Sequence, residues 1–322
     1  MCQTLNVSEK IQRFHSNGYI VLGLTVVLLL LTAGPSLAAD DWWDANWKKR
    51  VKVTLDNSDQ TETLVDFPVP VTLNTTNLPG LDLGATTGAD VRFRDAVTGN
   101  ELKYEVETWD AATDTAVVWV KVPQIVGGSS TDYIWVYYDY DGTASYDQST
   151  ADEQAVWNAN FKGVYHLKED PSTAGSGGIE DSTANGHDGT DTGGMVSGDS
   201  IAGRVGKALQ FDAAGKYIDY GDVDDFDFGT SNFSISLWVK GTGTEHDPYV
   251  TKSNYDTGCS NTTGIYIYRD RGEDIAAQYA YYIQKNCIIC ICGEEYLESG
   301  EDGTDADWHH GRYRHTSNKP IE

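Results

Sequence analysis

The sequence has few cations for its length. Its 322 residues include 23 lysines and arginines against 49 aspartates and glutamates, which gives a net charge of −26 at pH 7. Binding to phosphates needs clustered lysine and arginine, so nucleic acid is excluded as an expected partner, and anionic membranes are disfavoured for the same reason. The excess of negative charge favours cations or neutral glycans as partners, or a salty exterior as the environment. A need for solubility alone would also account for this excess.

Cysteine is scarce through most of the chain. Four of the five cysteines lie in the last 64 residues, at Cys259, Cys287, Cys290 and Cys292. The N-terminal domain must therefore be held together by its core. In an exported chain, four cysteines predict two disulfides with three possible pairings. The C-x2-C-x-C spacing would also suit zinc, with His309 or His310 as a further ligand, and the cysteines could have no defined role.

Long apolar runs are confined to the N-terminus. Lys10 and Arg13 precede an apolar run over residues 19–33, and a small-residue site follows at 36–38. This pattern is typical of a secretory signal peptide, here residues 1–38. The run is shorter than the roughly 20 residues that cross a bilayer. We therefore expect cleavage rather than an uncleaved anchor, no membrane insertion afterwards, and a secreted or cell-surface location.

Recognisable catalytic motifs are missing. The sequence contains no G-x-S-x-G, no H-E-x-x-H and no phosphate-binding loop. Glycoside hydrolysis needs two carboxylates flanking the scissile bond, and the acidic stretch 301–307 is a loop interrupted by glycine. We therefore expect a protein without catalytic activity.

Period-two alternation of apolar and polar residues dominates the part after the leader. It predicts an all-β fold, with an antiparallel β-sandwich of about six to eight strands over residues 41–145. A polar link at 141–153 lacks any periodicity, and a second β-sandwich domain is expected over 155–322. The alternating segments of the first domain are 51–55, 91–94, 102–107, 118–122 and 133–138.

Four motifs follow one another in the second half of the chain. They are VYHL at 164–167, DSTANGHDGT at 181–190, GKALQFDAAGKYIDYG at 206–221 and NFSISLWVKG at 232–241. VYHL is predicted to be a strand. In this order the motifs resemble the start of a concanavalin-A-like lectin/glucanase jelly roll of the laminin-G type. Residues 42–141 resemble a prokaryotic domain family of unknown function that often precedes such a jelly roll.

The resemblance has two further implications. The family usually supplies several strands beyond DADWHHG, and the pattern falters after Asp274, so the jelly roll is expected to be truncated or disturbed after about residue 270. Glucanase members carry an E-x-D-x-E strand or a close relative, which is missing here. Adhesins, binding modules and hydrolases share this fold, so the fold does not determine the function.

A calcium site is the one cofactor that the sequence predicts. Asp181, Asn185 and Asp188 place oxygen side chains in a glycine-containing loop, and calcium takes six to eight oxygen ligands. Jelly rolls of the resembled type often bind calcium at one rim. Asp225 and Asp227 form a weaker second acidic cluster. The alternative for the first loop is a hydrogen-bonded turn between strands.

Aromatic residues supply the candidate ligand contacts. Trp42, Trp43, Trp47 and Trp109 lie outside the clean alternating cores and are predicted to stack on sugar rings. Tryptophans inside strands, at 119, 135 and 238, are expected in the core. The sequence thus predicts an exported protein that binds carbohydrate or another cell-surface ligand. The alternatives are a fragment or accessory part of a polysaccharide-degrading enzyme, and a structural envelope or filament protein.

Overall fold

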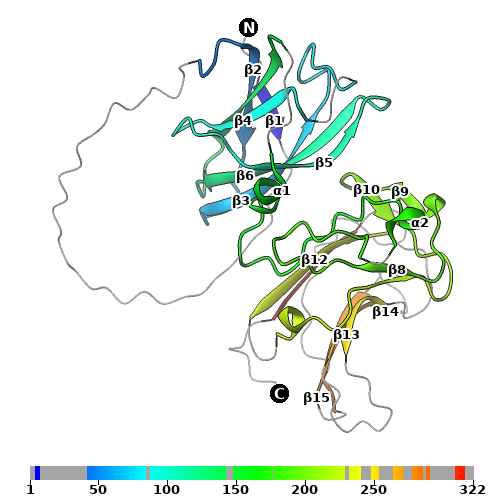
Figure 1. Cartoon of the computed structure of the whole chain (residues 1–322). Coiled ribbons are helices and arrows are strands. Elements are labelled where there is room, and N and C mark those ends of the chain that lie inside the picture. Colours follow the sequence, from blue (N-terminus) through cyan, green and yellow to red (C-terminus); the bar gives the residue numbers. More distant parts are fainter. Residues whose placement is uncertain are drawn as a thin grey trace, which may run out of the picture. The chain divides into compact units, whose positions relative to one another are not determined.

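A computed structural model of the whole chain is shown in Figure 1. It describes residues 42–84, 88–142, 148–175, 177–228 and 232–240, and the strand segments 4–7, 248–253, 264–270, 278–285, 288–290 and 309–315. The structure is 41% strand and 7% helix, which confirms the all-β prediction. The chain divides into two compact units, residues 1–221 and residues 222–322. Residues 148–221 belong to the first of these units, and the predicted domain bounds of 41–145 and 155–322 stay predictions.

The first unit is built on two sheets whose strands are antiparallel except for one pair, β1 and β2. One sheet has the order β1-β2-β7-β4, in which the strands are Thr4–Val7, Trp47–Leu55, Asp132–Tyr140 and Val91–Asp95. The other has the order β3-β6-β5, in which the strands are Leu64–Leu73, Thr115–Ile125 and Tyr104–Asp110. β1 lies within the predicted leader and pairs with β2 in parallel. Strands β2–β7 agree with the predicted sandwich.

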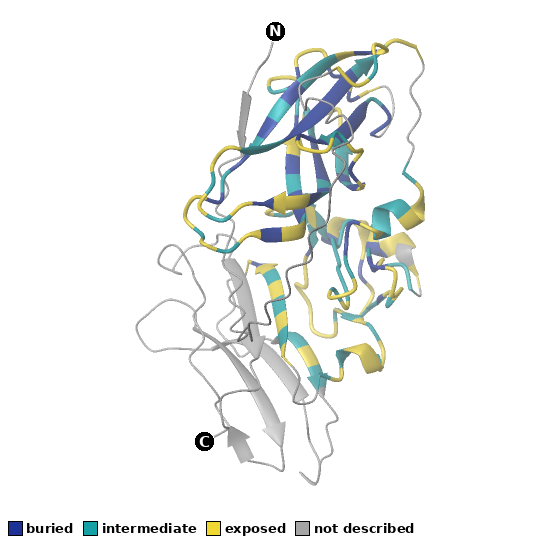
Figure 2. Ribbon diagram, turned by 90° about the vertical axis from the view of Figure 1, so that its left-hand side faces the viewer, coloured by how far each residue is buried: buried dark blue, intermediate teal, exposed yellow. Residues whose placement is uncertain are grey.

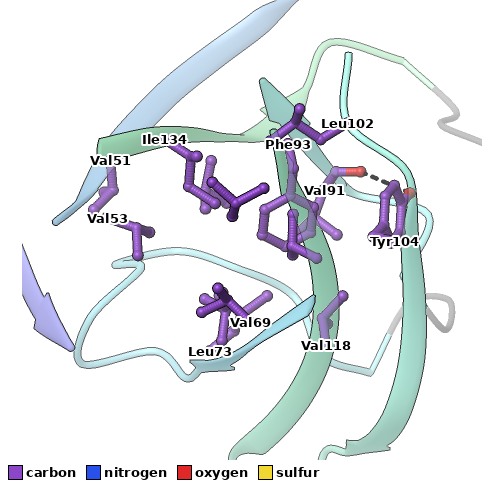
Figure 3. Packing of buried hydrophobic residues seen from close by; sticks show 14 of the residues in the cluster. Val51, Val53, Val69, Leu73, Val91, Phe93, Leu102, Tyr104, Val118 and Ile134 are labelled. Carbon is purple, nitrogen blue, oxygen red and sulfur yellow. Dashed lines mark hydrogen bonds between the residues drawn. The ribbon is translucent and has the colours of Figure 1, made fainter. Parts of the chain in front are cut away.

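Alternating valines, leucines and aromatic residues fill the space between the two sheets. Figure 3 shows Val51, Val53 and Ile134 from one sheet facing residues of the other. Phe93 and Tyr104 join the two sheets, since their ring centroids lie 5.1 Å apart. The buried Tyr104 hydroxyl donates to the carbonyl of Val91 at 3.2 Å. The period-two pattern is thus the reason the core forms, because it turns the apolar side of each strand toward the other sheet; Figure 2 shows the buried residues along the strands.

The outer face of the first sheet carries a second, smaller cluster. Trp47, Ala96, Trp135 and Tyr137 are buried there, with Tyr133 and Tyr140 packed against them. Trp135 is therefore buried, but in this outer cluster and not in the core between the sheets. Trp238 differs, because its side chain is 44% exposed on strand β12 of the second unit.

Residues 148–221 contain short elements joined by loops. Helices α1 and α2 span Thr150–Gln154 and Pro171–Ala174, and a 3-10 turn spans Ser197–Asp199. Two strand pairs are β8 (Thr190–Thr192) with β11 (Tyr217–Asp219), and β9 (Ser200–Ala202) with β10 (Lys207–Leu209). Their small core consists of Ile179, Met195 and Leu209.

The predicted strand at 164–167 is not formed. Leu167 has a φ of 55°, which breaks the extended backbone that a strand requires. Side chains fix this segment instead of a strand ladder. The amide of Val164 donates to the carboxylate of Asp181 at 3.0 Å, and its carbonyl accepts from the amide of Ser182.

The second unit contains two antiparallel sheets. In the first, β12 (Phe233–Val239) pairs with β17 (His309–His315). The second has the order β13-β14-β15-β16, with strands Pro248–Ser253, Gly264–Asp270, Gln278–Lys285 and Ile288–Cys290. The predicted disulfides and zinc alternative fall on side chains outside the described residues. Within the described parts of the chain, no helix is long and apolar enough to cross a membrane.

Two valines allow a matched test of the sandwich core. Val118 is fully buried between the sheets, whereas Val97 is 81% exposed. Val118→Ala removes two buried carbon atoms and leaves a small cavity, so it should lower the free energy of unfolding by about 2 kcal/mol. Val97→Ala should change it by less than about 0.5 kcal/mol. Denaturant unfolding of both variants checks this, and equal effects would contradict the described core.

Candidate functional site

Two glutamates on the outer face of β5 are buried. Glu105 and Glu107 alternate with the apolar residues of β5, which predicts that they face solvent, yet each is only 5% exposed. Residues 157–168 supply the groups that cover them. The indole N–H of Trp157 donates to the Glu105 carboxylate at 2.8 Å. The indole N–H of Trp119, on the neighbouring strand β6, donates to Glu107 at 2.8 Å.

A histidine lies between the two carboxylates. His166 Nδ1 lies 2.5 Å from Glu107 Oε2, and His166 Nε2 lies 3.4 Å from Glu105 Oε2. Lys168 Nζ is 3.4 Å from Glu105 Oε1, and the hydroxyl of Ser182 donates to the same oxygen at 2.7 Å. We call these five side chains the buried charge cluster. Its charges are paired and hydrogen-bonded, as buried charges must be.

The pKa values in this cluster follow from its pairing. Burial alone would raise the pKa of Glu105, but the hydrogen bond and charge of His166, the charge of Lys168 and the hydrogen bond from Trp157 lower it to about 2. Burial alone would lower the pKa of His166, but its hydrogen bonds to Glu105 and Glu107 raise it to about 9. The histidine is therefore an imidazolium at neutral pH.

The cluster is closed to substrates in this conformation. The side chains of His166, Glu105 and Glu107 are 6%, 7% and 2% exposed. A general base needs a free acceptor within reach of a substrate proton, and these groups hold one another instead. The arrangement attaches residues 157–182 to the outer face of β5. Sequence reasoning missed it because the two glutamates fit the expected polar face of a strand.

The predicted calcium loop is closed by hydrogen bonds. Asp181 is 5% exposed, and its carboxylate accepts from the amides of Val164, Thr183 and His187, each at 3.0 Å, and from the Thr183 hydroxyl at 2.8 Å. Asp188 accepts from the amide of Asp181 at 2.9 Å. The structure thus brings Asp181 and Asp188 together.

The other predicted oxygen ligands are placed differently. The side-chain amide of Asn185 donates to the carbonyls of Phe161 and Lys162. Asp225 and Asp227 belong to the second unit, where Asp227 lies 3.1 Å from Lys252. No group of three or more histidine, cysteine, aspartate or glutamate residues suited to a metal occurs among the described residues. The calcium site stays a prediction.

Three of the four predicted ligand-binding tryptophans lie together. Trp42 and Trp43 are 44% and 37% exposed, while Trp47 is 3% exposed beneath them. The rings of Trp43 and Trp47 are stacked with centroids 6.1 Å apart. The rings of Trp42 and Trp43 each form a T-shaped contact with the ring of Tyr137, with centroids 5.6 Å apart. Trp109 is separate, because it packs against the sandwich core and its N–H donates to the carbonyl of Leu83.

The indole of Trp42 is held in one orientation. Its N–H donates to the carbonyls of Asp44 at 2.9 Å and Trp47 at 3.0 Å. The guanidinium of Arg50 lies 5.1 Å from the centroid of Trp42 and donates to the hydroxyl of Tyr137 at 3.1 Å. An exposed ring that is already fixed loses little conformational freedom when a ligand packs on it. Trp42 is therefore the best-prepared contact on this surface.

The chain is an all-β protein whose first unit contains a two-sheet sandwich. Residues 87–168 match the family model described as "Domain of unknown function (DUF2341)". This agrees in part with the resemblance noted for residues 42–141. The matched stretch includes β4–β7 and ends at Lys168. It therefore includes every member of the buried charge cluster except Ser182. No curated protein and no solved structure matches the chain.

The charge of His166 should make stability depend on pH. Its pKa is about 9 in the folded chain and about 6.5 when unfolded. The contribution of His166 to the free energy of unfolding is thus complete below about pH 6.5, and it is lost as the pH rises through about 9. The shift corresponds to roughly 3 kcal/mol. At the acid end, the contribution of Glu105 is complete above its ordinary pKa of 4.5 and is lost as the pH falls through about 2.

His166→Gln tests this pH dependence. The variant leaves a buried carboxylate without its cation, so the free energy of unfolding near pH 6 should fall by about 3–5 kcal/mol. The decrease in the free energy of unfolding between about pH 6.5 and pH 9 should also be smaller in this variant. His187→Gln is the matched control, since it makes the same substitution at a partly buried histidine outside the buried charge cluster. Denaturant unfolding across pH measures both variants, and an unchanged alkaline decline in His166→Gln would contradict the assignment.

The hydrogen bonds of Asp181 predict a role that does not need a cation. Asp181→Asn turns one acceptor oxygen into a donor facing N–H and O–H groups, so it should lower the free energy of unfolding by about 1–3 kcal/mol in EDTA. Asp191→Asn is a control at a half-buried aspartate of β8. Thermal melts in EDTA and in millimolar calcium measure both. A loss of stability that appears only in calcium would show that the carboxylate acts as a metal ligand instead.

Proposed function

We propose that this chain is an exported binding protein of the cell surface or extracellular space, without catalytic activity, and that it binds carbohydrate or another surface ligand. The observation that carries the proposal is Trp42, an exposed indole whose N–H is satisfied inside the protein. Aromatic rings bury the apolar faces of pyranose sugars, and a fixed ring does so at a smaller entropic cost. Trp43 extends this surface, and the buried Trp47 supports it.

Two features of the sequence support export and a lectin-like second domain. The leader pattern covers residues 1–38, and the four jelly-roll motifs occur in the order of the resembled family. One of them, NFSISLWVKG, contains strand β12. The proposal includes a concanavalin-A-like jelly roll. Calcium at the Asp181 loop is proposed as an additional stabilising ligand, which the calcium and EDTA melts also test.

Trp42→Ala tests the proposed binding surface. The full chain should bind at least one polysaccharide of a panel that includes neutral and acidic glycans. The variant should weaken this binding by about tenfold or more, because burial of a large apolar side chain is worth about 1.5–3 kcal/mol. Trp238→Ala is the matched control, since Trp238 is also 44% exposed but lies in the second unit. Affinity gel electrophoresis and titration calorimetry measure the affinities.

Two outcomes would favour the alternatives. Release of reducing sugars from a bound polysaccharide would indicate a part of a glycan-degrading enzyme. Absence of binding to every glycan in the panel would overturn carbohydrate recognition and favour a structural role in an envelope layer or filament. A loss of binding in Trp238→Ala, with Trp42→Ala unaffected, would move the site to the second unit.

A further inference from the structure

We propose that the surface around Trp42 takes a polysaccharide whose sugar units carry carboxylates, an inference that rests on the binding function proposed above. The surface is the outer side of the sheet β2-β7-β4, and we call it the cation–aromatic face. Its partly or largely exposed members are Trp42, Trp43, Arg50, Lys52, Arg94 and Tyr133.

Strand pairing places cations on both sides of an aromatic row. The row lies on the central strand β7 and consists of Tyr133, Trp135 and Tyr137. On β2, Arg50 pairs with Tyr137 and Lys52 pairs with Trp135. On β4, Arg92 and Arg94 pair with the same two residues from the other side. The alternation of the strands thus gathers four cations on one face, because the intervening residues fill the core.

Each exposed ring of this face has a cation close to it. The guanidinium carbon of Arg94 lies 4.2 Å from the centroid of Trp43, and that of Arg50 lies 5.1 Å from Trp42. Lys52 Nζ lies 3.9 Å from the centroid of Tyr133. Cation–π attraction holds the cations beside the rings. Arg50 therefore lies next to the ring on which a sugar would pack.

The charge of this face is opposite to that of the chain. Glu101 is the carboxylate that lies near Arg92 and Arg94, at 3.8 Å and 3.9 Å. Arg92 is buried, so the partly exposed cations of this face are Arg50, Lys52 and Arg94, on a chain that carries −26 as a whole. A neutral glycan would use the rings alone. A uronic acid would use the rings for its pyranose and the cations for its carboxylate, which guanidinium binds well. Charge complementarity therefore favours an acidic polysaccharide.

The test compares one sugar polymer with and without its charge. The full chain is titrated with polygalacturonate and with its fully methyl-esterified form in EDTA, which keeps calcium out of the comparison. We expect the acidic form to bind about tenfold or more tightly, and binding to weaken as salt is raised. Lys52→Glu should weaken binding to the acidic form by about tenfold or more. Lys207→Glu makes the same charge change at an exposed position of β10 and should leave binding unchanged.

The outcomes separate this inference from the proposed function. Equal binding of the acidic and esterified forms, or binding of neutral glucans only, would overturn the inference and leave carbohydrate binding intact. Binding of poly-glutamate as tightly as polygalacturonate would show recognition of an acidic chain rather than a sugar, and would overturn it as well. A preference for sulfated over carboxylated polymers would have the same consequence. Failure to bind any glycan would overturn both proposals.

Discussion

The pairing of His166 with Glu105 and Glu107 is the interaction on which the first unit depends. Two carboxylates on one strand face cannot be buried without cations and donors, since the desolvation of unpaired charge costs several kcal/mol. His166, Lys168 and two indole N–H groups supply what the carboxylates lose. Residues 157–168 can therefore cover β5 only in a narrow range of positions, because hydrogen bonds to charged groups tolerate little displacement. The family match ends at Lys168, where this covering segment ends.

The two sheets of the sandwich use their outer faces for different purposes. The outer face of β5 and β6 is closed by the buried charge cluster and has no exposed carboxylate from Glu105 or Glu107. On the outer face of β2, β7 and β4, by contrast, Trp42 and Trp43 stay exposed and cations surround them. Acidic side chains are thus buried on the outer face of one sheet, whereas basic side chains are partly exposed on the outer face of the other. A strongly acidic chain carries a locally basic surface in this way, and its overall charge does not reveal it.

Part of this arrangement could be predicted from the sequence. Strands β2 and β7 follow directly from alternation, and so do the buried positions of Val51 and Val53. The grouping of Trp42, Trp43 and Trp47 as exceptional tryptophans also agrees with their common location. VYHL at 164–167 shows the limit of alternation, because an alternating tetrapeptide became an irregular segment fixed by Asp181. Short alternating stretches carry no information on whether a partner strand is available.

The sequence by itself determined the fold class and the inner faces of the strands, because the burial of apolar side chains with period two is a local property of each segment. Only the tertiary structure decided which polar faces stay in water. Glu105 and Arg50 both occupy outward positions on strands, and nothing near either residue in the sequence distinguishes them. Glu105 is covered because Trp157 and His166, more than 50 residues away, reach it. Such contacts depend on how distant segments meet, and this is set by the packing of the whole unit rather than by any local pattern.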